Sequence, residues 1–151
     1  MPSALLIPLT MSILAGSMIV LQAPINARLG EHMGGPLVAA FFSFFTGTIL
    51  LGCVLLALRK PVLLDNIGQT SPWMWLGGTL GAMFVFTTIF VVPKLGAAGM
   101  IALIICGQIL FSLVVDHYGF LLPDATPLSP IRIAGAVLLV ISVAMIMAPK
   151  F

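Results

Sequence analysis

Residues 73–115 read WMWLGGTLGAMFVFTTIFVVPKLGAAGMIALIICGQILFSLVV, and this stretch establishes the fold class of the chain. Lys94 is its only charged side chain and lies in the sequence Pro93-Lys94-Leu95-Gly96. A helix needs about 20 mostly apolar residues to cross the hydrocarbon core of a bilayer. We therefore predict two transmembrane helices, at residues 73–92 and 95–115, with Pro93 ending the first. The turn between them is so short that we expect the two helices to pack as an antiparallel hairpin.

Three further apolar runs extend this pattern over the whole chain: residues 4–22, 37–58 and 131–148. No Lys, Arg, Asp or Glu lies in the interior of any of the five runs, and Arg132 is the second residue of the last run. The charged side chains therefore fall in the connections or at helix ends, where the cost of burying them is smallest. The first run has no preceding Lys or Arg, so we do not expect it to be a cleaved signal peptide. We expect an all-α integral membrane protein with five transmembrane helices in a single domain over residues 1–151.

The composition supports a membrane protein and excludes other classes. Hydrophobic residues make up 61% of the chain and charged residues 7%, against roughly 45–50% and about 25% in a typical soluble protein. A net charge of +2 is too small for a nucleic-acid interface. The spans contain no nucleophile–base pair and no cluster at metal-ligand spacing. We therefore expect neither an enzyme nor a protein that holds a metal or a cofactor.

The positive charges are the best guide to orientation, because positively charged connections favour the cytoplasmic side. Five spans would put the two termini on opposite sides of the membrane. The six Lys and Arg residues then divide equally: Arg59, Lys60 and Arg132 on the N-terminal side, and Arg28, Lys94 and Lys150 on the other. Without a bias both orientations should form, so we predict that the chain inserts both ways and pairs with an inverted copy of itself. The alternative is a weakly biased protein that is oriented by span hydrophobicity or by a partner.

An inverted pair would have the symmetry of many membrane transporters. Secondary transporters are commonly built from inverted repeats, with the substrate site between them near the bilayer midplane. Five spans cannot contain two equal inverted halves, whereas two oppositely inserted copies would supply ten helices and the twofold axis. We therefore predict a transporter for a small solute. The alternatives are an ion channel built in the same way and a structural or assembly subunit without transport activity.

Uncharged polar side chains on the first helix are candidates for the substrate pathway. Gln22 and Asn26 are four residues apart and share one face of a helix. Pro24 lies between them, where it would weaken the helix and free a backbone carbonyl. The alternative role for these side chains is hydrogen bonding between helices.

A second set of pathway candidates lies on the fourth span. Gln108, Ser112 and Asp116 recur at four-residue spacing and form a polar stripe along one face. Polar side chains that face lipid are costly, so this stripe should face protein or a water-filled cavity. Asp116 lies near the end of the span, so the alternative for it is a solvated position at the membrane interface.

Inversion would also bring two groups of titratable residues to the same membrane level. Glu31 and His32 are expected on one side of the membrane, and Asp116 and His117 on the other. In an inverted pair, each group would face the other group from the second copy. We predict an intersubunit gate or a pH-sensitive contact there.

Several motifs together resemble one transporter family. They are Gln22-x-x-x-Asn26-Ala27-Arg28-Leu29-Gly30, Pro93-Lys94-Leu95-Gly96, Gly107-Gln108 followed by Ser112, Asp116-His117-Tyr118-Gly119, and Arg132-x-x-Gly135. The combination is similar to the five-helix YdcZ-like family of the drug/metabolite transporter superfamily and covers essentially the whole chain. The resemblance implies a bacterial inner-membrane transporter that works as a homodimer or with a sister chain.

The chain differs in one respect from other members of that superfamily. The smaller four-helix multidrug exporters of that superfamily use a carboxylate in the middle of the first helix. The first span of this chain has only Ser, Thr and Gln as polar residues. The difference argues against proton-coupled export of drug cations.

Overall fold

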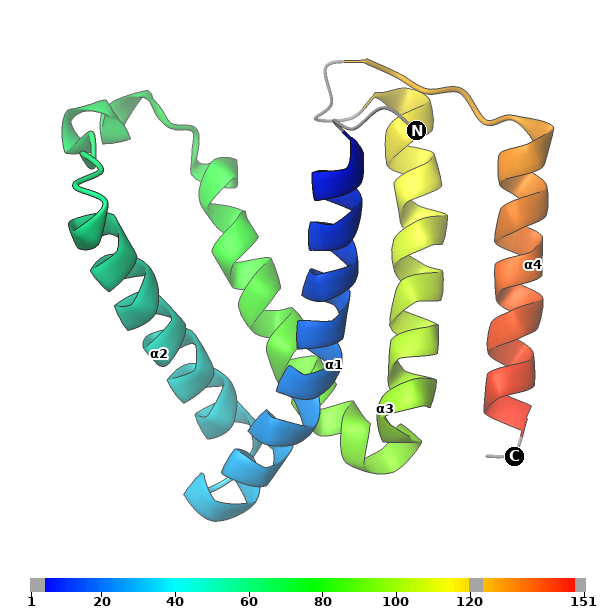
Figure 1. Ribbon diagram of the computed structural model, residues 1–151, viewed down its shortest axis with the longest axis horizontal. Helices are drawn as coiled ribbons and strands as arrows, with labels where there is room; N and C mark the ends of the chain where they lie inside the picture. The colour runs from blue at the N-terminus through cyan, green and yellow to red at the C-terminus, as the bar shows by residue number, and fades with distance from the viewer. Residues whose placement is uncertain (1–4, 120–123, 149–151) are drawn as a thin grey trace. The chain divides into compact units, whose positions relative to one another are not determined.

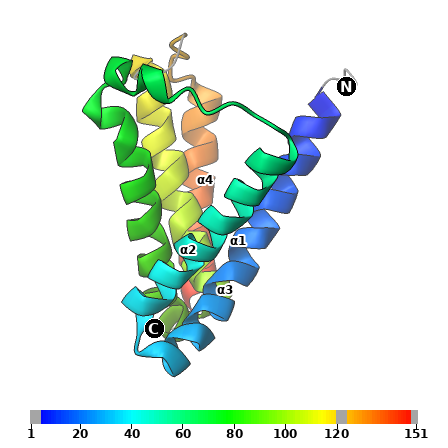
Figure 2. The same ribbon diagram turned by 90° about the vertical axis from the view of Figure 1, so that its left-hand side faces the viewer.

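The computed structural model describes residues 5–119 and 124–148, and every regular element in these ranges is helical (Figures 1 and 2). The longer helices are α1 (Leu6–Met33), α2 (Pro36–Ala57), α3 (Leu76–Tyr118) and α4 (Pro130–Met147). Two short 3₁₀ helices, η2 (Leu64–Gln69) and η3 (Pro72–Trp75), lie between α2 and α3. The predicted all-α class is confirmed, and the four longer helices are each long and apolar enough to cross a membrane.

Helix α3 contains a break in its backbone. Its 43 residues would extend about 65 Å as a regular helix, roughly twice the thickness of the hydrocarbon core. At Gly96 the backbone leaves the helical region, with φ 70° and ψ 166°. A glycine adopts this left-handed φ without the steric cost that a side chain would bring. α3 therefore consists of two helical segments, which correspond to the predicted spans 73–92 and 95–115.

The prediction that Pro93 ends a helix is wrong, because Pro93 lies inside α3 and the helical geometry continues to the break at Gly96. A proline removes one backbone hydrogen bond and can be accommodated by a kink, whereas a left-handed residue reverses the local path of the chain. The glycine, not the proline, thus determines where the first segment ends.

The helix that contains the first predicted span continues beyond residue 22, and the membrane bounds of that span remain a prediction. α1 continues through Pro24 to Met33 and ends at Gly34, which has a φ of 98°. Gly35 follows with a φ of 120°, and its N–H donates to the carbonyl of Gly30 at 2.8 Å. The first connection is thus a turn of two glycines. The residues between 23 and 33 are helical, because a proline inside a helix does not by itself terminate it.

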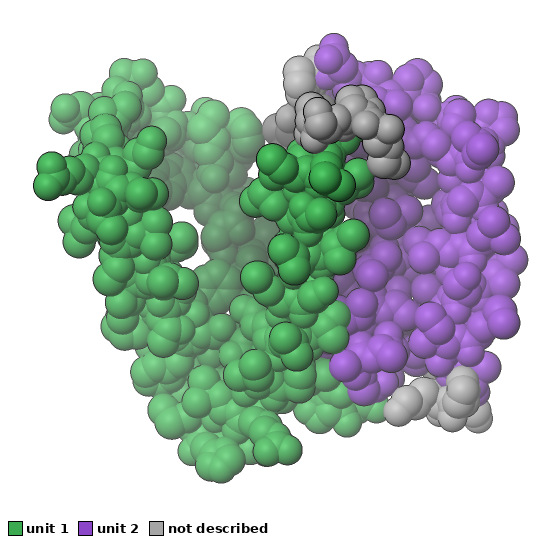
Figure 3. All heavy atoms as spheres, in the orientation of Figure 1, with its two compact units in different colours: residues 1–94 green, residues 95–151 purple. Residues whose placement is uncertain are grey.

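The chain divides into two compact units, residues 1–94 and 95–151 (Figure 3). In the first unit, Ala39 and Ala40 of α2 pack with Val85 and Ile89 of α3. In the same unit, α1 and α2 meet at the glycine turn and diverge toward their other ends (Figure 1). In the second unit, Ala102 of α3 packs with Val143 and Met147 of α4. The single domain expected over residues 1–151 remains a prediction.

Most apolar side chains of the long helices face outward. Only 6% to 17% of the most hydrophobic window of each helix is buried within the chain. Leu56 and Ile131, for example, are 80% and 81% exposed. A surface of this kind is stable in lipid or against another apolar chain but not in water. The structure therefore supports the membrane environment that the composition predicts.

Close approach of the backbone at the glycine turn leads to a prediction about stability. A Cβ atom on Gly30 would lie 3.2 Å from both the carbonyl carbon and the oxygen of Gly35, neither of which can rotate away. We expect Gly30→Ala to lower the free energy of unfolding by about 1–3 kcal/mol, the usual cost of overpacking. Unfolding in mixed micelles with increasing dodecyl sulfate measures this change.

The matched control is Gly16→Ala on the same helix, because a Cβ atom there meets nothing within 4 Å. Alanine has the higher helix propensity, so the control should be neutral or stabilising by up to about 1 kcal/mol. An equal effect of the two substitutions would contradict the steric account.

Candidate functional site

The first candidate residue, Gln22, borders a small cavity between α1 and α2. Gln22 is half-buried, and the cavity has a volume of about 220 Å³. The side of the cavity formed by α2 consists of Ser43, Phe44, Gly47, Thr48 and Leu51. The amide of Gln22 can both donate and accept hydrogen bonds. The cavity therefore joins a polar end, at Gln22 and Ser43, to apolar walls.

Asn26 lies one helical turn further along α1 and is 6% exposed. Its Nδ2 donates to Oγ of Ser43 at 3.1 Å and links α1 to α2. This contact is the interhelical hydrogen bond that the sequence offered as an alternative for Asn26. The geometry favours a role for Asn26 in holding Ser43 beside Gln22, and its place in a substrate pathway remains a prediction.

A larger cavity, of about 580 Å³, lies between α2 and the segment of α3 before Gly96. Four phenylalanines line it: Phe41, Phe44, Phe45 and Phe86. The rings of Phe41 and Phe45 are stacked, with centroids 6.2 Å apart and an interplanar angle of 8°. Sequence reasoning missed this cavity. The signal was present, because three of the phenylalanines occur at the spacing i, i+3 and i+4 on one face of α2.

In the second unit, the predicted polar stripe lies on the segment of α3 after Gly96. Gln108 is exposed, and Ser112 is half-buried and donates to the carbonyl of Ile109 at 2.9 Å. The segment is helical from Gln108 to Asp116, so the three residues share one face as the spacing predicted.

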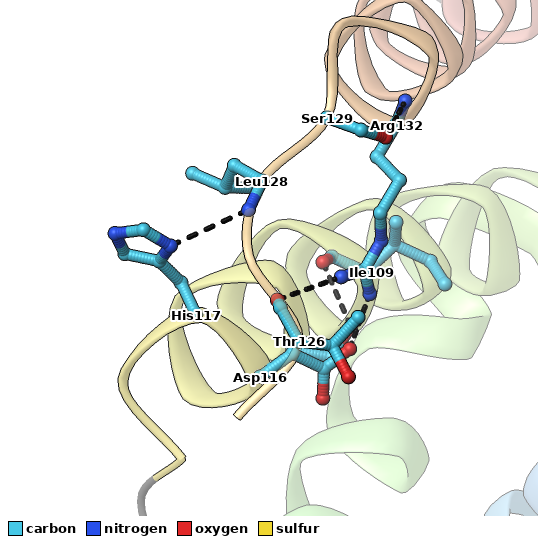
Figure 4. A network of polar contacts seen from close by, with 8 residues as sticks. Ile109, Asp116, His117, Thr126, Leu128, Ser129 and Arg132 are labelled. Carbon is cyan, nitrogen blue, oxygen red and sulfur yellow. Dashed lines mark hydrogen bonds and ion pairs between the residues drawn. The ribbon is translucent and has the colours of Figure 1, made fainter. Parts of the chain in front are cut away.

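The third member of the stripe, Asp116, is paired with a cation. Its carboxylate accepts a hydrogen bond from Arg132 at the start of α4, and the two side chains are 30% and 28% exposed (Figure 4). The other guanidinium nitrogen of Arg132 donates to the carbonyl of Thr126 at 3.1 Å. The N–H of Thr126 in turn donates to the backbone carbonyl of Asp116 at 2.7 Å. The carboxylate is thus neutralised within its own unit.

Sequence reasoning missed this ion pair. Asp116 and Arg132 flank the same connection, so both are expected on the same side of the membrane. Opposite charges at the two ends of one connection were therefore a usable signal. The orientation count used the positive charges alone, so the pairing of Asp116 with Arg132 was not predicted.

The proposed gate residues make contacts of their own. His117 accepts a hydrogen bond at Nδ1 from the N–H of Leu128 at 3.3 Å, so the proton of its neutral ring lies on Nε2 (Figure 4). Nδ1 of His32 donates to the carbonyl of Arg28 at 2.9 Å, and Glu31 is exposed. The pairing of these groups across two inverted copies remains a prediction.

The chemistry that these residues offer to a solute is hydrogen bonding. Across residues 5–119 and 124–148, no three His, Cys, Asp or Glu side chains lie together as a metal-binding group. The polar groups that border the two cavities are amide and hydroxyl groups. Such groups can bind and orient a solute.

Comparison with known proteins gives one match. The family described as "Putative inner membrane exporter, YdcZ" matches residues 7–145. No curated protein and no solved structure matches the chain. The family match covers nearly the whole chain and confirms the resemblance that the motifs indicated.

The ion pair between Asp116 and Arg132 leads to a second prediction. We expect Asp116→Ala and Arg132→Ala each to lower the free energy of unfolding, and the double variant to cost less than the sum of the two. The coupling should be about 0.5–1 kcal/mol, because both side chains are partly solvated. Dodecyl sulfate titration of the four proteins gives this coupling.

Asp65→Ala serves as the control, because Asp65 lies on η2 in the other unit. Its effect should add to that of Arg132→Ala without coupling. Strict additivity for Asp116 and Arg132 would show that the ion pair contributes nothing to stability.

Proposed function

We propose that two oppositely inserted copies of this chain, which belongs to the YdcZ family of inner membrane exporters, form a transporter for a small solute. Membership places the protein in the inner membrane and in the class of membrane transporters. The finer proposal concerns the number of spans, the pairing of copies and the position of the pathway.

The first part of the proposal is that the chain crosses the membrane five times. α1, α2 and α4 each supply one crossing, and α3 supplies two, one on either side of Gly96. The length of α3 and the left-handed φ of Gly96 support this division. An odd number of crossings puts the termini on opposite sides. The equal division of positive charges between the two sides assumes this arrangement.

The equal division of positive charges is the observation that carries the proposal. Three Lys or Arg residues fall on each side of a five-span chain. Insertion is oriented by an excess of such residues in the connections, so an equal count leaves both orientations accessible. Two copies in opposite orientations then generate the twofold axis that single-chain transporters obtain from inverted repeats.

The exposure of polar side chains supports the proposal that a partner chain covers them. Gln108 is exposed on a helix whose other side chains are mostly apolar. A glutamine that faces hydrocarbon would leave an amide without hydrogen bonds, which is costly. A second copy can cover this face and enclose a water-filled route at the same time. The outward-facing apolar side chains of all four long helices supply the surface for such contact.

The pathway in this proposal is formed by uncharged hydrogen-bonding groups near the midplane. Gln22 and Gln108 bind the solute, and Ser112 continues the route toward the membrane surface. Asn26 holds Ser43 in place at the bond between α1 and α2. Asp116, paired with Arg132, stands at the outer end of the route. Glu31, His32 and His117 form the gate between copies, and rocking of the two copies would expose the site alternately.

The third prediction concerns orientation in living cells. Fusions of a fluorescent protein and of alkaline phosphatase to the C-terminus report cytoplasmic and periplasmic locations, respectively. We expect both fusions of the native chain to be active. Arg59→Ala with Lys60→Ala leaves one positive side chain on the N-terminal side against three, so it should increase fluorescence and decrease phosphatase activity.

The opposite variant, Arg28→Ala with Lys94→Ala, is the matched control and should shift the two activities the other way. Activity from only one of the two native fusions would refute the inverted pair. A single orientation with flux that does not saturate would indicate a channel, and a single orientation without flux would indicate an assembly subunit.

A further inference from the structure

The two cavities of the first unit share part of their lining. Phe44 and Thr48 of α2 border both the small cavity beside Gln22 and the larger cavity beside α3. α2 thus separates a polar space from an apolar space and contributes the same two side chains to each. The two spaces therefore adjoin at Phe44 and Thr48.

The two cavities differ in chemistry. In the larger one, the four phenylalanine rings and the apolar side chains around them leave Thr48 and Thr79 as the polar residues. In the smaller one, Gln22, Ser43 and Thr48 gather at one place. The hydroxyl of Thr48 already donates to the carbonyl of Phe44 at 2.8 Å, so its oxygen is left to accept. Together these groups offer a hydrogen-bonding end and an aromatic body.

Charge decides which class of molecule fits. The residues that line the two cavities are all uncharged. A charged ligand would have to leave water with no counter-ion in the lining, which costs more than burial of a neutral polar group. Attraction of a cation to phenylalanine faces recovers only part of that cost. A neutral ligand has no such penalty.

We propose that the two adjoining cavities together form one binding site, the joined cavity, for an uncharged amphipathic solute. This solute has an aromatic or apolar body and a neutral hydrogen-bonding head such as an amide or a hydroxyl. The body lies among Phe41, Phe45 and Phe86, and the head reaches Gln22 and Ser43. The inference rests on the proposed function, because it names the substrate class of the transporter. The larger cavity, at about 580 Å³, is within the range of roughly 300–1,000 Å³ that is typical of small-molecule sites.

Two positions allow the site to be filled without disturbing the fold. A Cβ atom on Gly47 meets nothing within 4 Å, and Gly47 borders the polar cavity. Ala82 is exposed and borders the phenylalanine cavity. Leucine at either position would extend into the space, and leucine is itself a good helix-forming residue. Gly52 on α2 also meets nothing within 4 Å and borders neither cavity, so Gly52→Leu is the matched control.

The experiment uses two photoreactive probes that share a benzophenone body and differ in the head group. They are 4-benzoylbenzamide, which is neutral, and (4-benzoylbenzyl)trimethylammonium, which is cationic. The full chain in liposomes of phosphatidylethanolamine and phosphatidylglycerol is irradiated with each probe, and labelled peptides are located by mass spectrometry. We expect the neutral probe to label residues 37–51 and 79–86 with saturation, and the cationic probe to label them about tenfold less.

The variants test whether the neutral probe binds inside the joined cavity. Gly47→Leu and Ala82→Leu should each reduce labelling by the neutral probe about tenfold, equivalent to about 1.4 kcal/mol of binding free energy. Gly52→Leu should label like the native chain. Labelling that rises without saturation, and that Gly47→Leu leaves unchanged, would mean that lipid chains occupy the joined cavity. Absence of labelling in the native chain would mean that a second copy fills it, and equal labelling by both probes would refute the selection for neutral solutes. Each of these three results would overturn the inference.

The outcome is independent of the orientation experiment. Fusions active on both sides together with any of the three contrary results would refute the substrate class and leave the inverted transporter standing. Saturable labelling together with a single orientation would refute the inverted transporter and leave the substrate class standing.

Discussion

The cost of placing charge in hydrocarbon governs this protein from its sequence to its site. Charged side chains make up only 7% of the chain, and none lies in the interior of a predicted span. Where ionic groups approach the membrane they are accommodated locally. Asp116 pairs with Arg132, and the ammonium group of Lys94 lies 3.5 Å from the centre of the Phe90 ring. The groups left for contact with a solute are therefore amides, hydroxyls and aromatic rings.

Glycine shapes the chain at the points where helices end. The turn at Gly34 and Gly35 and the break at Gly96 all use a positive φ, which a side chain would make costly. Pro24 and Pro93 lie inside helices instead. In a bilayer every backbone group must be satisfied, so a helix is maintained through a proline wherever neighbouring bonds can compensate. Close approach at Gly30 then brings α1 and α2 together and positions Asn26 beside Ser43.

Structural and functional roles meet on α2. One part of this helix packs its small residues Ala39 and Ala40 against α3. Another part directs Phe44 and Thr48 toward two cavities of different polarity. The proposed neutral site suits the proposed dual insertion, which requires an equal count of positive charges on the two sides. Further ionic side chains for a charged substrate, if positive, would alter that balance. The two proposals are thus compatible with each other and with the low charge of the chain.

The lengths of the hydrophobic runs were enough to predict the membrane class, the helical content and the extents of α2 and α4, which lie within a residue of the predicted 37–58 and 131–148. Run length is a local property, so it can be read along the chain. Sequence reasoning missed both the Asp116–Arg132 pair and the phenylalanine cavity. The sequence carried a local signal for each, in the opposite charges that flank one connection and in the spacing of the phenylalanines on α2. Helices that are apolar on every face, however, carry no periodic signal of which face meets which neighbour. The tertiary structure alone decided which groups meet, because the pair depends on the path of a connection and the cavity depends on how two helices cross.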